Sequence, residues 1–302
     1  MLRKSIHSII AVILGLCFLP LNLAALKKPY IVTTNTTLES VIKEIVKENA
    51  DVVSLSRAEQ DLHYIEPRPS FVVHLRRADM LVIIGMELDM WVESLIDASR
   101  NPKITYNAIG YVDTSVNIDK LGVPQGRIDA SMGHLHAQGN PHFHYSPNNI
   151  PVIAASIYEG LKRVDPANEG LYKKNLDNYL MRFNKAFVSW QSKMDKLENK
   201  KIVAYHESWE YFANDFGLEI IGHLEPKPGI PPSPAHVNAI IERIKSQNVG
   251  IIIQETFYPQ KTGRMVAGQT KAKLVVLPSA VGEMGTKDTI GLFNKITDMI
   301  LK

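Results

Sequence analysis

The chain has 302 residues, of which 45% are hydrophobic and 22% are charged, and its formal net charge is +3. These values are ordinary for a globular protein with a sizeable core in one large domain or two modest ones. The small net charge and the absence of a Lys/Arg run argue against a protein that binds nucleic acid through a basic surface.

The first 25 residues have the pattern of a secretory signal peptide. Arg3 and Lys4 form a basic start, residues 9–21 are apolar, and residues 22–25 (Asn-Leu-Ala-Ala) offer small residues for cleavage near Ala25. The alternative is an uncleaved membrane anchor, but the apolar run is short for a span and contains Pro20. We therefore expect an exported mature protein without a membrane span.

The only cysteine, Cys17, lies in this leader. Leu16 stands before it, where a lipoprotein signal has a small residue, so lipidation is the less favoured interpretation. Without the leader, the chain can form neither a disulfide nor a thiolate metal site. Metal ligands in the mature chain must therefore be histidine, aspartate or glutamate.

The first part of the mature chain, residues 26–150, alternates strand-like and helix-like segments. Short apolar or β-branched runs predict strands at residues 30–34, 51–55, 80–84 and 104–107. Apolar residues at positions 38, 41, 42, 45 and 46 recur at helical spacing. Continuous apolar strands separated by helices indicate a parallel sheet covered on both faces, and hence an α/β lobe. Residues 110–149, rich in Gly, Asn, Pro and His, predict a long loop.

Residues 151–200 predict a helical linker. Pro151 suits the first turn of a helix that runs to about residue 164. After Asp165-Pro166, a broad apolar stripe continues to about residue 199. A helix of roughly 33 residues would span about 50 Å, longer than one small lobe, so we expect it to form a spine between two lobes.

Residues 201–302 repeat the alternation and predict a second α/β lobe. Strand-like runs occupy residues 201–205, 218–222, 249–254 and 273–277, and helix-like runs occupy residues 209–216, 237–247, 263–270 and 289–301. The predicted fold is therefore α/β, with two lobes that carry parallel-type sheets and are joined by a long linker helix. The cleft between two such lobes is a natural place for a buried ligand.

Three histidines stand at the ends of predicted strands or in the loops after them, namely His63, His142 and His206. Neutral imidazole is the commonest metal ligand, and open α/β sheets bind ligands beyond the carboxyl ends of their strands. Side chains from such distant parts of the chain can meet only in the folded protein. The pattern therefore predicts a tertiary metal site between the lobes.

The surroundings of these histidines form specific motifs. His63 lies in Asp-Leu-His-Tyr-Ile-Glu-Pro (61–67), His142 lies in Asn-Pro-His-Phe (140–143), and His206 precedes an aromatic-rich segment ending in Phe-Gly-Leu (216–218). In this order and spacing the motifs resemble those of the metal-binding receptors of bacterial ABC importers for zinc and manganese, the cluster A solute-binding proteins. The resemblance covers nearly all of the mature chain. It implies a receptor that captures a metal with these histidines and delivers it to a membrane permease and its ATPase.

One departure from the family concerns the fourth ligand. Relatives often carry an aspartate in a loop near the C-terminus, but here that loop reads Leu-Pro-Ser-Ala-Val-Gly (277–282) and has no carboxylate. Water, Glu283 or Glu255 can fill the fourth position instead. Asp61 and Glu66 are expected to orient His63 from behind the imidazole.

The three histidines favour zinc as the bound metal. Manganese prefers oxygen-rich sites, whereas imidazole suits zinc, copper and nickel. The resemblance points the same way, because manganese members carry a carboxylate in place of the third histidine. His134 and His136 are candidates for an auxiliary metal-collecting site, with two solvated loop histidines as the alternative. His144 can substitute for His142 as ligand, although the Asn-Pro-His context favours His142.

The sequence therefore predicts a periplasmic zinc receptor, most simply a monomer, rather than an enzyme. The main alternative is a zinc hydrolase, because catalytic zinc also uses three histidines and an open fourth position. No His-Glu-x-x-His motif supports that alternative. An extracellular metal-binding adhesin or buffer is the third interpretation.

Overall fold

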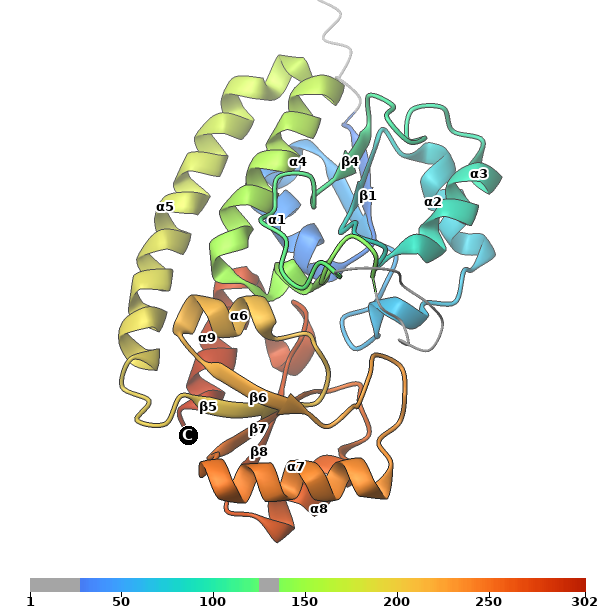
Figure 1. Cartoon of the computed structure of the whole chain (residues 1–302). Coiled ribbons are helices and arrows are strands. Elements are labelled where there is room, and N and C mark those ends of the chain that lie inside the picture. Colours follow the sequence, from blue (N-terminus) through green and yellow to red (C-terminus); the bar gives the residue numbers. More distant parts are fainter. Residues whose placement is uncertain (1–27, 125–135) are drawn as a thin grey trace, which may run out of the picture.

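The computed structural model describes residues 28–124 and 136–302, so the expected signal peptide lies outside the described residues. Two α/β lobes lie one above the other in Figure 1, and the long helix α5 (Glu169–Met194) runs along one side of both. The first lobe contains β1 (Tyr30–Thr33), α1 (Thr36–Val46), β2 (Asp51–Ser54), α2 (Pro69–Arg77), β3 (Met80–Ile83), α3 (Glu93–Ser99), β4 (Tyr111–Asp113) and α4 (Ile150–Val164). The second contains β5 (Lys201–Ala204), α6 (Glu210–Phe216), β6 (Glu219–His223), α7 (Pro234–Gln247), β7 (Ile251–Glu255), α8 (Gln260–Gln269), β8 (Lys273–Leu277) and α9 (Thr289–Ile300).

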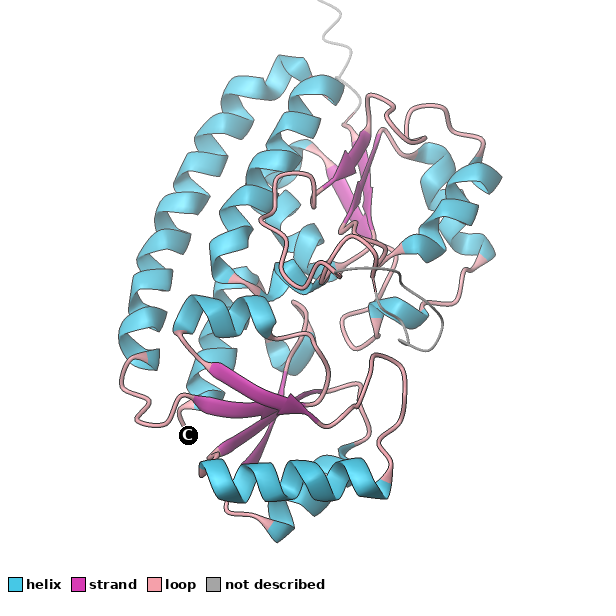
Figure 2. Ribbon diagram, viewed as in Figure 1, coloured by secondary structure: helices cyan, strands magenta, loops and turns pink. Residues whose placement is uncertain are grey.

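Both sheets are fully parallel and have the same strand order. The first runs β2-β1-β3-β4 and the second β6-β5-β7-β8. Helices cover both faces of each sheet, as Figure 2 shows, which explains why the strands are apolar on both faces. The predicted fold class, two parallel-sheet lobes joined by a long helix, is confirmed.

One strand prediction is wrong. Residues 104–107 form bends and turns, and the fourth strand of the first lobe is β4, which begins at Tyr111. Only Ile104 of the predicted run is buried, whereas Tyr106 is 76% exposed and Asn107 has a φ of +61°. The run has strand-like residue types, but it has no neighbouring strand to pair with. The helices α2 and α3 were also not foreseen.

The spine helix α5 is shorter than predicted because Pro166–Asn168 form a separate 3-10 turn and the helix ends at Met194. It nevertheless contacts both lobes. Asn175 donates a hydrogen bond to the carbonyl of Ile45 in the first lobe, at 2.9 Å, and the Tyr179 hydroxyl lies 2.7 Å from the Thr289 hydroxyl in the second. Because one helix is fixed to α1 of the first lobe and α9 of the second, large hinge motions of the lobes are restricted. No helix within the described residues is both long and apolar enough to span a bilayer.

Candidate metal centre

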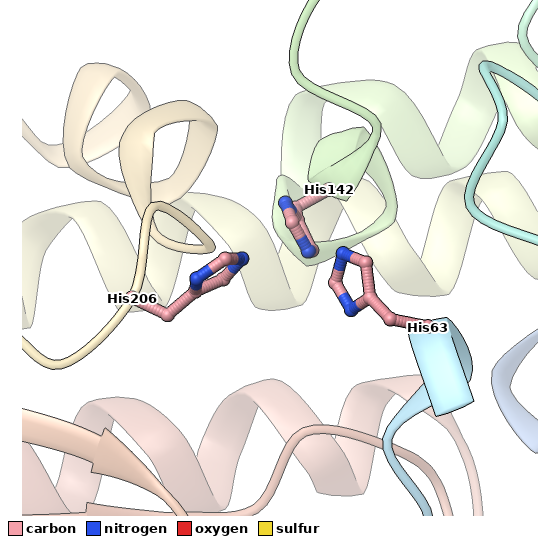
Figure 3. Close-up of side chains that lie close together, drawn as sticks. All are labelled: His63, His142 and His206. Carbon is pink, nitrogen blue, oxygen red and sulfur yellow. The ribbon is translucent and has the colours of Figure 1, made fainter. Parts of the chain in front are cut away.

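His63, His142 and His206 lie together where the two lobes meet, and their rings point toward one another in Figure 3. One ring nitrogen from each lies within 4.8 Å of the other two. In a tetrahedral zinc site with Zn–N bonds of about 2.0–2.1 Å, the nitrogens lie roughly 3.4 Å apart. A small closing motion therefore suffices for all three to bind one ion.

The first lobe supplies two of the imidazoles through the same local device. His63 and His142 each stand in a short 3-10 turn, residues 62–64 and 142–145. In each case an oxygen two residues earlier lies close to both the backbone N–H and the Nδ1 of the histidine. Asp61 Oδ1 lies 3.0 and 2.7 Å from these atoms of His63, and Asn140 Oδ1 lies 2.9 Å from both in His142. An oxygen that accepts from Nδ1–H leaves Nε2 as the nitrogen with a lone pair.

The second lobe supplies His206, two residues after β5, and holds it differently. Its Nδ1 lies 2.6 Å from Oε2 of Glu225, a residue 19 positions further along the chain. Glu225 and His206 are both buried. Glu225 was missed by the sequence analysis. The one available signal was its position two residues after the strand that pairs with β5, at the same edge of the sheet.

The three sites differ in their electrostatics. Burial, reinforced by the neighbouring imidazoles, holds the pKa of His142 well below its usual value. Burial also lowers the pKa of His206, but the hydrogen bond to Glu225 and the nearby carboxylates outweigh it, so the net pKa of His206 is raised. The pKa of Asp61 is lowered, because its hydrogen bonds with His63 outweigh the effect of burial. Two of the three imidazoles therefore have a carboxylate partner at Nδ1: Asp61 for His63 and Glu225 for His206.

The candidates for a fourth ligand are placed in contrasting ways. Neither Glu255 nor Glu283 belongs to the imidazole cluster found within the described residues. Glu283 Oε1 accepts hydrogen bonds from the Ser279 and Ala280 backbones and the Ser279 hydroxyl, and its other oxygen accepts one from Thr256. Both carboxylate oxygens of Glu283 therefore already accept hydrogen bonds, which fix the local loop.

Glu255, at the end of β7, is fully buried and has no hydrogen bond of ordinary geometry to either oxygen. Burial raises the pKa of Glu255 to about 7, and the nearby Ser208 and His206 lower it by less. It is therefore a buried carboxyl group near His206 that titrates close to neutral pH. Glu66, expected to support His63, is exposed and makes no described hydrogen bond to it.

Three other loop histidines, at positions 134, 136 and 144, were candidates for metal binding. His134 lies outside the described residues. The ring of His136 lies 5.4 Å from that of His63, near the cluster but outside it. His144 is buried beside His142, at 6.4 Å between ring centres, and does not belong to the cluster either.

Two cavities reach the cluster, and His142 lines both. The smaller, about 20 Å³, is also lined by His63, Ser208 and Tyr258. A volume of that size is enough for one water molecule. The larger, about 260 Å³, is also lined by His206 and Pro228 and gives the cluster a second approach.

Comparisons with known proteins bear on the family of the chain. The family model described as the periplasmic component A of the zinc-uptake complex, ZnuA, matches residues 31–302. The iron-binding protein YfeA of Yersinia pestis is 24% identical over 91% of this chain and 86% of its own length. The high-affinity zinc uptake protein ZnuA of Bacillus subtilis is 26% identical over 84% and 79%. The manganese ABC transporter lipoprotein PsaA of Streptococcus pneumoniae is 23% identical over 86% and 83%.

Solved structures share the fold. A crystal structure of ZnuA superposes with a TM-score of 0.77 at 22% identity, over 91% of this chain and 98% of that one. A manganese-bound periplasmic metal-binding protein of Candidatus Liberibacter asiaticus gives the same score at 18% identity and the same coverage.

Proposed function

Because the chain belongs to the family of periplasmic zinc-uptake components, we propose that its cargo is Zn²⁺, held by Nε2 of His63, His142 and His206. Membership makes the chain a metal-binding receptor of an ABC importer rather than an enzyme. What remains to be argued for this chain is the ion and the residues that hold it.

The observation that carries the proposal is the convergence of three imidazoles whose Nδ1 atoms all face oxygens. Each ring therefore presents Nε2, and the three presented atoms face one another. This is the arrangement of a three-histidine zinc site with one position left for another ligand.

The choice of zinc rests on the donors, since the names of relatives differ. The Yersinia, Bacillus and Streptococcus proteins are named for iron, zinc and manganese. An all-imidazole set suits zinc, whereas manganese favours carboxylate and carbonyl oxygens. No carboxylate within the described residues joins the cluster, which supports zinc.

A water molecule in the small cavity is our proposal for the fourth ligand. Glu283 is committed to its loop, and Glu255 needs to move to reach the ion. An auxiliary loop site that includes His136 and His134 remains a separate proposal, supported only by the closeness of His136 to His63.

For its setting, we propose export through a cleaved signal peptide, residues 1–25, and action in the periplasm as a monomer. The partners are an ABC permease and its ATPase, to which the receptor delivers the ion. Release requires the permease to favour a state in which the three imidazoles no longer converge.

Competition for metal against a zinc chelator tests the proposal. We expect one tightly bound Zn²⁺ that Mn²⁺ does not displace, and a large loss of affinity in His63→Ala, His142→Ala and His206→Ala. His74→Ala is the matched control, because His74 binds the Tyr30 hydroxyl on the surface of the first lobe. Tight binding that survives all three cluster substitutions would exclude this site.

A further inference from the structure

The carboxylate of Glu225 contacts two parts of the molecule at once. Oε2 lies 2.6 Å from Nδ1 of His206, and Oε1 accepts a hydrogen bond of 2.9 Å from the backbone N–H of Gly229. The backbone of Glu225 is fixed as well, because its N–H donates to the carbonyl of Tyr205 at 2.9 Å. Glu225 is therefore held beside His206 and links it to the segment that follows.

That segment is a tight turn. The N–H of Ile230 donates to the carbonyl of Lys227 at 2.9 Å, with Pro228 and Gly229 at the two central positions. Gly229 has a φ of +76°, the value that the second central residue of a type II turn requires, and proline is favoured at the first. The turn itself leaves the N–H of Gly229 without an internal partner, and Glu225 supplies one.

The turn also borders the metal site. Pro228 is buried and lines the larger cavity together with His142 and His206. A shift of the turn therefore changes both the wall of that cavity and, through Glu225, the support of His206. The supports of the other two histidines do not contact this turn: Asp61 lies two residues before His63, and Asn140, two residues before His142, donates instead to the carbonyl of Glu207.

We propose that Glu225 is a positioning residue that couples metal occupancy at His206 to the turn of residues 227–230, an inference that rests on the proposed function. A dication on Nε2 polarises the imidazole and makes Nδ1–H a stronger donor to Glu225. The strengthened contact fixes the carboxylate and, with it, the N–H of Gly229. By reciprocity, displacing the turn weakens the hold on the metal.

Amide exchange at Gly229, followed by NMR with and without saturating Zn²⁺, tests the coupling. We expect zinc to slow exchange at Gly229 by about tenfold in the native protein, because the amide opens less often. In Glu225→Ala, zinc affinity falls by about 10–100-fold, the usual effect of losing an outer partner of a ligand, and saturating zinc no longer protects Gly229.

Two further variants keep the test decisive. Glu225→Gln retains the size of the side chain, so affinity and protection both fall by less than in Glu225→Ala. Gly229→Ala strains the turn without touching a ligand and weakens zinc binding several-fold if the coupling is real. Asp61→Ala is the matched control: it removes the partner of His63 in the first lobe, weakens zinc binding, and leaves the zinc-dependent protection of Gly229 in place.

The results separate the two proposals. Equal protection of Gly229 by saturating zinc in the native protein and Glu225→Ala overturns the coupling, and so does zinc binding that is unchanged in Gly229→Ala. Neither result touches the assignment of the ligands. Zinc affinity that is the same in the native protein and in His206→Ala removes the proposed function itself, and the coupling with it.

Discussion

The two lobes share a topology and differ in how they hold a metal. Each has a four-stranded parallel sheet with the same strand order. The first lobe contributes two histidines, each supported by a side chain two residues before it. The second contributes one histidine, which is supported across strands by Glu225 and lies near the buried Glu255. The first lobe therefore supports its two ligands from two residues away in the sequence, whereas the second supports its single ligand from a neighbouring strand end.

This difference assigns unequal roles to the lobes. Asp61 orients His63 from within the first lobe, whereas Asn140, which orients His142, also donates to the carbonyl of Glu207 in the second lobe at 2.6 Å. The orientation of His206 depends on Glu225, which follows the neighbouring strand β6. A structural change in the second lobe should therefore affect this ligand most. Because α5 restricts large lobe motions, small shifts around His206 are the natural way to loosen the site.

The largest expected effect comes from removing the single ligand of the second lobe. In His206→Ala we expect zinc affinity to fall by more than about 100-fold, beyond the range for an outer partner. That loss corresponds to about 2.7 kcal/mol of binding free energy, so most of the zinc-dependent rise in melting temperature should disappear. Calorimetric melting with and without zinc measures it. An undiminished rise would show that the second lobe does not hold the metal.

Glu255 offers an effect of comparable size, on the stability of the metal-free protein. Burial raises its pKa from 4.5 to about 7, so the folded state holds the proton more tightly than the unfolded state. The stabilising contribution is complete below pH 4.5 and is lost as pH rises through 7, a change of roughly 3 kcal/mol. Glu255→Gln stays neutral, so it should gain stability relative to the native protein between pH 5 and pH 8 in urea unfolding. A difference independent of pH would contradict the burial of an ionisable carboxyl.

The smallest effects should come from the local supports of the first lobe. Asn140→Ala leaves His142 without a partner for Nδ1, and we expect a loss of zinc affinity of about 10–100-fold. Asp61→Asn keeps an oxygen in place and removes only the charge, so its loss should stay below about tenfold. Isothermal titration of both variants ranks them. If Asp61→Asn proves the more damaging, charge rather than orientation is the main contribution of these supports.

The sequence predicts the architecture better than its details, for physical reasons. Strands buried on both faces are nearly continuous apolar runs, so the two sheets could be located from composition alone. Residues 104–107 have the same composition but lie in turns, because strand formation requires a partner that local sequence does not show. The helix α2 was missed because it lies at the surface with a single buried residue, Leu75. Its apolar pattern in the sequence is therefore weak.

In the metal site, too, contacts between residues close in the sequence are easier to predict than contacts that depend on strand pairing. The supports of His63 and His142 act over two residues, so Asp-x-His and Asn-x-His can be read directly from the chain. The Glu225–His206 contact depends on the pairing of β5 with β6, which brings together residues 19 positions apart. Glu255 and Glu283 were both candidate ligands, and only their different burial and hydrogen bonding distinguish them.

The most direct test of the central claim is anomalous diffraction at the zinc absorption edge from crystals of the zinc-loaded protein. The account predicts one strong peak between the lobes, with Nε2 of His63, His142 and His206 at about 2.0–2.1 Å from it. A strong peak elsewhere, with the three imidazoles left without metal, would contradict the three-histidine receptor site.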